Sequence, residues 1–226
     1  MQRTISAMVG KGSVNHNSRK FRAENVDGTR THLNIDYCNE NIKTVYHELF
    51  DEALERYNAK QIRSDRKIKD YYEKIRSSKQ EKPFHEIILQ VGGKGNMNAD
   101  TENGELAKQI LDEYYQGFQE RNPQLRVFSA HLHMDEATPH LHIDFVPFTT
   151  GSKRGLDTRV SLKQALATQG FKGGSRGDTE WSQWIQSEKE QLAAVMERYG
   201  IEWEHKGTHE KHLSVLDYKK QEREKE

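Results

Sequence analysis

The chain has 226 residues, and its 35 Lys and Arg balance its 35 Asp and Glu, so the formal charge at pH 7 is zero. A charged fraction of 31% and a hydrophobic fraction of 33% indicate a globular domain with a modest core, and no apolar stretch approaches the length of a membrane span. The single cysteine, Cys38, excludes an intramolecular disulfide, and no signal peptide is evident, so we expect a bacterial cytoplasmic protein.

The zero net charge hides an uneven distribution along the chain. Residues 1–34 hold six Lys and Arg against two acids, and residues 150–176 hold six against one. Residues 177–226 are acidic, with eight basic residues against twelve acidic ones. Local positive charge attracts phosphate groups whatever the charge of the whole chain, so the two basic segments are candidate nucleic-acid contacts.

Hydrophobic periodicity predicts a succession of strands and helices. Apolar or β-prone runs predict strands at 4–9, 84–91, 126–133 and 140–148, and helical spacing predicts helices at 44–57, 65–76, 100–121, 161–170 and 179–199. A polar, glycine-containing stretch after residue 9 predicts a loop. The sum is an α+β fold, a largely antiparallel central sheet with helices on its faces.

The domain organisation follows from the same pattern. We expect one domain over residues 1–204 and a charged helical tail over residues 205–226 that leads to a C-terminal region outside this chain. A homodimer could form through that further region. The glycine-rich segment 150–180 is expected to be a binding loop.

The most informative segment is VFSAHLHMDEATPHLHIDFVP, residues 127–147, which contains four of the eleven histidines. Its apolar, β-prone flanks predict a hairpin with a connection through Met134 to Pro139. Because strand side chains alternate, His140, His142 and Asp144 would share one face, and the hairpin would bring His133 beside His140 and His142. Three imidazoles that converge with room for solvent or substrate are typical of a catalytic metal site.

The expected cofactor is a divalent metal ion. Imidazole ligands favour Mn, Zn, Ni or Co over Mg, and Mn²⁺ is the preferred candidate, with Mg²⁺ as a further alternative. No glycine-rich phosphate loop follows any predicted strand, so no nucleotide cofactor is expected.

Two N-terminal strings, residues 14–19 and 28–34, combine imidazole, guanidinium and amide groups. Arginine binds phosphate oxygens in a bidentate manner, and asparagine can bind a base edge or orient a histidine, so both strings suit a phosphodiester. The predicted DNA contacts are Lys11, Asn17, Arg22, Arg30, His32, Asn34, Lys153 and Arg154, with Arg159, Lys172 and Arg176 as further candidates in the glycine-rich loop.

Taken together, three motifs give the chain a specific resemblance to a known family, the MobV-type plasmid mobilisation relaxases, also called Mob/Pre plasmid recombination enzymes. The motifs are HNSR at 16–19, TRTHLN at 29–34 and HMDEATPHLH at 133–142, the last followed by Val146, Pro147 and Phe148. They occur in the family's order within residues 1–150. The resemblance implies the fold of the histidine-hydrophobe-histidine (HUH) endonucleases.

The resemblance also implies an activity and its residues. The family makes a strand-specific nick in supercoiled plasmid DNA at an origin of transfer and remains joined to the 5′ phosphate. The DNA must be single-stranded or extruded where it is cut. The family's metal-binding histidines correspond to His133, His140 and His142, its acidic residue to Glu136, and its nucleophile to His16. Arg19 of the same string is counted with the catalytic residues.

The residues leave alternatives open. A histidine is largely neutral at cytoplasmic pH, so its nitrogen can attack without a strong base, whereas a tyrosine would need one. Tyr37 and Tyr46 remain reserve candidates for the nucleophile. The rival functions are a phosphoesterase or nuclease that uses metal-activated water, and a non-catalytic module that binds the origin.

Overall fold

The computed structural model describes residues 1–205. Of the predicted helical tail, all but His205 therefore lies outside the described residues. None of the helices within residues 1–205 is long and apolar enough to cross a membrane.

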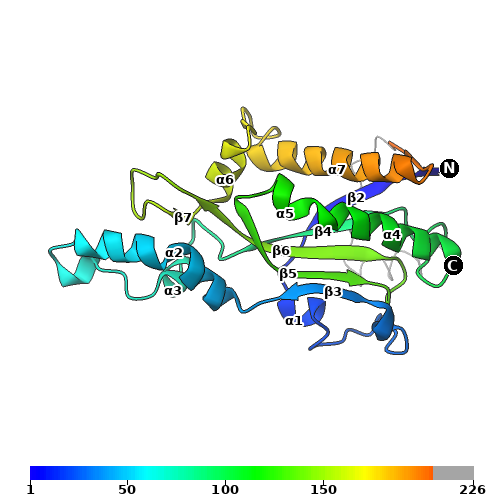
Figure 1. The fold of residues 1–226 in the computed structure, drawn as a ribbon, viewed down its shortest axis with the longest axis horizontal. Coiled ribbons are helices and arrows are strands. Elements are labelled where there is room, and N and C mark those ends of the chain that lie inside the picture. The colour runs from blue at the N-terminus through cyan, green and yellow to red at the C-terminus, as the bar shows by residue number, and fades with distance from the viewer. Residues whose placement is uncertain (206–226) are drawn as a thin grey trace.

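The centre of the molecule is a six-stranded sheet with the order β2-β4-β6-β5-β3, and β7 pairs with β6 (Figure 1). The strands are β2 (Ile5–Val9), β3 (Ile35–Asn39), β4 (His85–Val91), β5 (Leu125–His133), β6 (His140–Thr149) and β7 (Arg159–Val160). All pairings in this sheet are antiparallel, which confirms the predicted fold class. The short strands β1 (Gln2–Arg3) and β8 (Glu202–Trp203) form a separate parallel pair.

Helices connect the strands and supply much of the core. They are α1 (Val14–Asn17), α2 (Ile42–Ala59), α3 (Tyr71–Arg76), α4 (Glu102–Gln116), α5 (Phe118–Arg121), α6 (Leu162–Thr168) and α7 (Glu180–Arg198). Two short 3₁₀ turns, η1 (Thr31–Leu33) and η2 (Ser64–Arg66), lie in the loops.

The alternation of side chains along β4 separates the two faces of the sheet. Ile87, Leu89 and Val91 are fully buried in a core shared with α4 to α7, whereas Ile88 and Gln90 point to the opposite face and are partly exposed. This second face carries the histidines.

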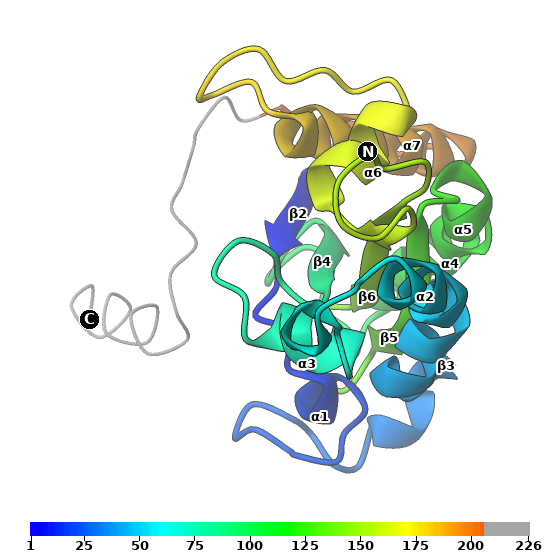
Figure 2. The same ribbon diagram turned by 90° about the vertical axis from the view of Figure 1, so that its left-hand side faces the viewer.

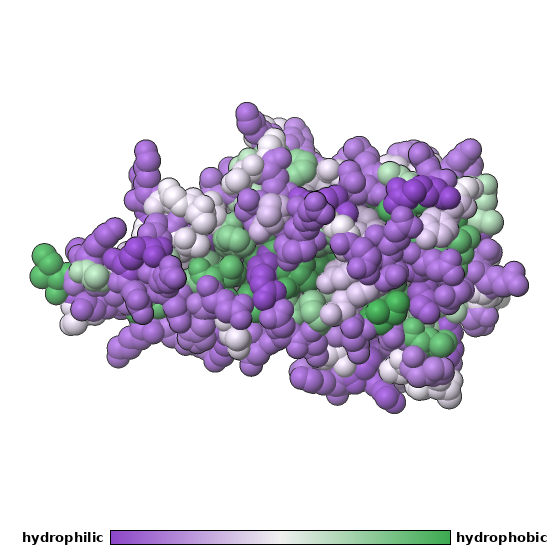
Figure 3. Space-filling view, in the orientation of Figure 1, coloured by the Kyte–Doolittle hydropathy of each residue, from purple (hydrophilic) through white to green (hydrophobic). Residues whose placement is uncertain are grey.

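A smaller hydrophobic cluster holds α2 and α3 to the end of the sheet. Phe50 of α2 and Tyr71 of α3 pack with Phe128 of β5 and Val146 of β6. The two helices project beyond the sheet as an arm (Figures 1 and 2). The surface in the view of Figure 3 is mainly hydrophilic, in agreement with the charged fraction of 31%.

Several details differ from the sequence-based expectation. The helix predicted at 100–121 is divided into α4 and α5 at Gly117, and the one predicted at 65–76 is helical only from Tyr71, after the turn η2. The loop predicted after residue 9 contains the one-turn helix α1. Strand β3 was not predicted, because its sequence IDYCN is short and has no clear alternation.

Candidate metal centre

The hairpin of β5 and β6 brings three predicted metal ligands together. The register places His133 opposite His140 and His131 opposite His142, so these side chains share a face as predicted. The ring centroids of His133, His140 and His142 lie 4.7 to 5.2 Å apart.

Each of the three rings has one nitrogen fixed by an acceptor. Nε2 of His133 donates to the backbone oxygen of Asn17 at 2.8 Å, Nδ1 of His140 donates to that of Thr138 at 2.8 Å, and Nδ1 of His142 donates to Oε1 of Glu86 at 2.6 Å. The remaining nitrogens are thereby left unprotonated and able to bind a cation. Nε2 of His142 is buried and has no hydrogen-bond partner among residues 1–205, which suits a nitrogen that binds a metal ion.

Burial favours neutral imidazoles at this centre. It lowers the pKa of His142 to about 4, and it lowers the pKa of His133 strongly, with further lowering from the neighbouring His142, His140 and Arg19. A histidine binds a metal only through an unprotonated nitrogen, so two of the three rings are in the binding form at neutral pH.

The donor atoms form two overlapping groups that share His133. The donors of His133, Glu136 and His140 lie within 4.8 Å of one another, and so do those of His16, His133 and His142. Nitrogen and carboxylate donors at this spacing fit a transition-metal ion. His16, predicted as the nucleophile, therefore lies among the candidate ligands.

His16 lies on α1, one turn of helix that begins after Ser13. Its Nε2 is 3.5 Å from Oε1 of Glu136 and 3.4 Å from Nη1 of Arg19. A guanidinium can only donate, so Nε2 accepts from Arg19 in the tautomer that carries its proton on Nδ1, and this tautomer leaves Nε2 with the lone pair that a nucleophile needs. The side chain is 23% exposed, which leaves the ring accessible to a substrate.

Arg19 is held in place by two acids from the histidine hairpin. Its guanidinium donates to Glu136 at 2.9 Å and contacts both carboxylate oxygens of Asp135. Its backbone has a φ of 57°, a left-handed conformation that costs energy in a non-glycine residue and is often found at functional sites. Burial raises the pKa of Glu136, but hydrogen bonds and charges from His16, His140 and Arg19 outweigh this, so the net shift is downward.

A buried polar network of Glu86, Asn17 and Asp144 holds the ring of His142 in place. The side-chain amide of Asn17 donates to Oε1 of Glu86 at 2.8 Å and to Oδ2 of Asp144 at 2.9 Å. Burial raises the pKa of Asp144 to about 7, with a further contribution from Glu86. Burial also raises the pKa of Glu86, but hydrogen bonds from His142, Gly12 and Asn17 outweigh burial, so the net shift of this pKa is downward. Sequence reasoning missed Glu86; the signal was a lone carboxylate within a strand predicted to be central, which is costly unless it is paired.

Three predicted DNA contacts are engaged inside the protein instead. Asn17 is 1% exposed, so its side chain is not available to DNA in this structure. Asn34 binds Asp135 and the backbone nitrogen of Met134, and Arg30 donates to the backbone oxygen of Met134. These contacts position the hairpin connection.

The other predicted contacts are exposed, but only part of them lie near the histidines. Exposed side chains are Lys11, Arg22, His32, Lys153 and Arg154. Lys153 and Arg154 come after the end of β6. That end, Thr149, lies nine residues or roughly 30 Å along the strand from His140. Their loop is attached to α2 through a bidentate ion pair of Arg56 with Asp157 at 2.8 Å. The structure therefore does not bring Lys153 and Arg154 to the histidines.

Neither reserve tyrosine faces the histidines. The Tyr37 hydroxyl donates to Asp112 of α4 at 2.7 Å, and the Tyr46 hydroxyl donates to the backbone oxygen of Pro83 at 2.6 Å. Burial raises the pKa of both phenols above the ordinary value, so both are poorer nucleophiles than a free tyrosine.

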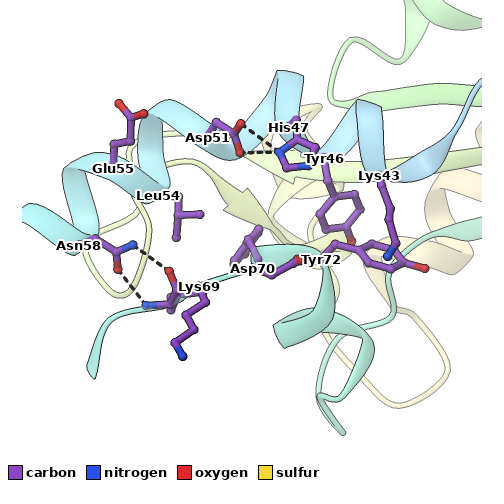
Figure 4. A pocket seen from close by; sticks show the side chains of 12 residues that line it. Lys43, Tyr46, His47, Asp51, Leu54, Glu55, Asn58, Lys69, Asp70 and Tyr72 are labelled. Carbon is purple, nitrogen blue, oxygen red and sulfur yellow. Dashed lines mark hydrogen bonds and ion pairs between the residues drawn. The ribbon is translucent and has the colours of Figure 1, made fainter. Parts of the chain in front are cut away.

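Away from the histidines, a cleft of about 320 Å³ lies between α2 and α3 (Figure 4). Several of its polar groups are paired within the protein: His47 with Asp51, and the Asn58 side chain with the backbone of Ile68. The cleft contains no grouping of metal-binding side chains comparable to that on the sheet, within residues 1–205.

Comparison with known proteins identifies the family. The model of the plasmid recombination enzyme family (Mob_Pre) matches residues 13–220, which is most of the chain. The chain belongs to this family. The predicted resemblance to the MobV/Mob_Pre relaxases is thereby confirmed.

Curated relatives are similar over different lengths. The chain is 27% identical over 157 residues to a plasmid recombination enzyme type 3 of Staphylococcus aureus, a match that covers 68% of this chain and 33% of the relative. It is 26% identical to a type 2 enzyme of Staphylococcus aureus, covering 100% of this chain and 46% of that protein. The chain thus spans less than half the length of these relatives.

The fold also matches a solved structure. A Mn-bound crystal structure of the MobM relaxase domain with plasmid pMV158 oriT DNA superposes with a TM-score of 0.55 and 21% identity, covering 96% of this chain and 99% of the other. This establishes that the chain has the relaxase-type fold.

Proposed function

We propose that this domain nicks and rejoins one strand of DNA at an origin of transfer by transesterification, with His16 as the nucleophile. Support comes from the family, from the DNA present in the MobM structure, and above all from one observation. A ring nitrogen of His16 lies within 4.8 Å of candidate donor nitrogens of His133 and His142. A nucleophile and a cation site at this separation can engage the same phosphate group.

In this proposal His133, His140 and His142 hold a divalent cation, with Glu136 as a fourth donor. Mn²⁺ is the first choice, since the MobM structure contains it, and Mg²⁺, Zn²⁺, Ni²⁺ or Co²⁺ are alternatives. When bound, the ion would polarise a non-bridging phosphate oxygen and stabilise negative charge in the transition state. The reaction needs no nucleotide.

The chain's own residues bind and orient the reacting groups. His16 Nε2 forms a bond to phosphorus, the bond from phosphorus to the 3′ oxygen breaks, and this oxygen leaves as a hydroxyl with a proton from solvent. The product is a phosphoramidate that joins the protein to the 5′ phosphate. Arg19 lies 3.4 Å from His16 Nε2, which favours the tautomer without a proton on that nitrogen, and it offers positive charge to the phosphate, while Asp135 and Glu136 fix the guanidinium. Attack by the 3′ hydroxyl reverses the step and reseals the strand.

The first test is the formation of a covalent adduct. Supercoiled DNA that carries the region around this chain's own gene, and single-stranded fragments of it, are incubated with Mn²⁺ and the chain, and a DNA-linked band is sought on a denaturing gel. We expect His16→Ala to abolish the adduct, because it removes the proposed attacking nitrogen and both reserve tyrosines are bonded elsewhere. His47→Ala, an exposed histidine on α2, is the matched control and should form the adduct normally.

Mn²⁺ binding to the same variants separates a nucleophile from a ligand. As a nucleophile, His16 can be removed with little change in Mn²⁺ affinity. If His16→Ala loses Mn²⁺ together with the adduct, His16 is a ligand and the proposal fails. Free DNA ends without an adduct in the unmodified chain would indicate the water-using nuclease, and binding without cleavage would indicate the non-catalytic module.

Three further statements stay predictions. They are a single-stranded or extruded DNA substrate, a homodimer through a C-terminal region outside this chain, and a cytoplasmic location. The domain boundary at residue 204 is likewise a prediction.

A further inference from the structure

A cleft of about 380 Å³ extends from the histidines across the sheet towards the β2 edge. The registers define its floor. Met8 of β2 lies opposite Ile88 of β4, which in turn lies opposite His142 of β6. Gln90 of β4 lies opposite His140 in the next row. The floor is therefore continuous with the candidate metal centre.

The chemistry of this floor differs from that of a phosphate site. Met8 and Ile88 are partly exposed apolar side chains, and the cleft lining includes no Lys or Arg among residues 1–205. A volume at the lower end of the usual range for small-molecule pockets, roughly 300–1,000 Å³, suits a flat, largely apolar group. The sulfur of a methionine also makes favourable contacts with aromatic rings.

Two side-chain amides border the floor. Gln90 donates one N–H to the backbone oxygen of Gly92 at 2.9 Å, and Asn25 donates one to Oε2 of Glu136 at 2.6 Å. These bonds orient both amides. Neither side-chain oxygen has a hydrogen-bond partner within the described part of the chain, so each offers an acceptor at the cleft.

We propose that this cleft holds one nucleobase of the cut strand, next to the scissile phosphate, and that Gln90 and Asn25 recognise its edge. The proposal rests on the proposed function for its ligand, because a phosphate beside His16 places the adjoining base within reach of the floor. The base faces pack on Met8 and Ile88. The free amide oxygens accept from an exocyclic amine, so adenine and cytosine are preferred over thymine.

The test measures binding rather than cleavage. Fluorescence anisotropy gives the affinity of the whole chain, in the presence of Mn²⁺, for the single strands dA12, dC12 and dT12 and for a twelve-unit sugar-phosphate strand without bases. We expect dA12 and dC12 to bind more tightly than dT12, by about fivefold or more. Gln90→Met, which keeps the size of the side chain but removes its amide, should reduce this preference to less than twofold.

A second variant tests the apolar floor. Met8→Ala should weaken all three base-bearing strands by about three- to tenfold and leave the strand without bases unchanged. Gln186→Met on the exposed surface of α7 is the control for the glutamine substitution, and thermal melting checks that each variant is folded.

Two results would overturn the inference. Equal losses on strands with and without bases would mean that the cleft holds the DNA backbone, and unchanged affinities in both variants would mean that it holds no part of the strand. These readings do not depend on adduct formation. If no adduct forms but base discrimination is lost in Gln90→Met, the nicking proposal fails while the base-binding cleft stands.

Discussion

At the scale of single residues, the candidate centre depends on partners that hold each imidazole in one orientation. His142 is fixed by Glu86, and Glu86 is fixed in turn by Asn17 and by the backbone nitrogen of Gly12 at 2.7 Å. Such outer partners raise the basicity of a ligand and keep its ring aligned. Asn17 is thus a positioning residue for two histidines, because its backbone oxygen also accepts from His133.

This dependence gives a prediction for metal affinity. We expect Glu86→Gln to weaken Mn²⁺ binding by about 10- to 100-fold, because the neutral amide is a poorer acceptor for His142 than the carboxylate. Isothermal titration with Mn²⁺ measures the change. Glu102→Gln, at the exposed start of α4, serves as the control and should bind Mn²⁺ normally. Unchanged affinity in Glu86→Gln would show that Glu86 does not support the ligand.

At the scale of elements, the layer of helices is joined by a buried polar network. Glu188 of α7 is 3% exposed and accepts from Tyr114 of α4, from Arg121 at the end of α5 and from Asn122. The indole nitrogen of Trp184 donates to the side-chain oxygen of Asn122 at 2.7 Å. A network of this kind specifies how the helices pack only when all its members are satisfied.

Removal of its central acid should therefore be costly. We expect Glu188→Ala to destabilise the domain by about 3–5 kcal/mol, since it leaves the buried donors of Tyr114 and Asn122 and a partly exposed arginine without their acceptor. Urea unfolding followed by circular dichroism gives the free energy. Glu190→Ala on the exposed side of the same helix should change it by less than about 0.5 kcal/mol. Similar effects of the two substitutions would argue against the network.

At the scale of the whole molecule, the candidate site joins segments that are far apart in the chain. α1 supplies His16, β4 supplies Glu86, and the hairpin of β5 and β6 supplies the other donors. The proposed ligands of the ion lie on the hairpin, and α1 and β4 hold their rings in place, so the ion stabilises the folded state, because the unfolded chain does not hold the ligands together.

Metal binding should accordingly raise the melting temperature. At a Mn²⁺ concentration about 100 times the dissociation constant, the expected stabilisation is about 2.7 kcal/mol, or roughly 5–10 °C for a domain of this size. Differential scanning fluorimetry with and without Mn²⁺ checks this, and chelation should reverse it. His142→Ala should show little shift and His32→Ala the full one. A full shift in His142→Ala would place the ion elsewhere.

The sequence by itself determined the features that depend on near neighbours. The spacing of apolar residues predicts α2, α4, α7 and the strands β4 to β6, because burial of one face imposes a period on the chain. The string from His133 to His142 likewise predicts converging histidines, because a hairpin register follows from its short connection. Four-residue helices and edge strands, such as α1 and β3, have too few residues for a period to show.

Only the tertiary structure decided which distant groups meet. Glu86 lies 56 residues from His142 and Asp135 lies 116 residues from Arg19, and neither pairing leaves a local signature in the sequence. The same packing turned Asn17 inwards and left Lys153 and Arg154 at the far end of β6. Side-chain type limits what a residue can do, but burial and partners, which arise from contacts across the whole chain, decide which of those roles it takes.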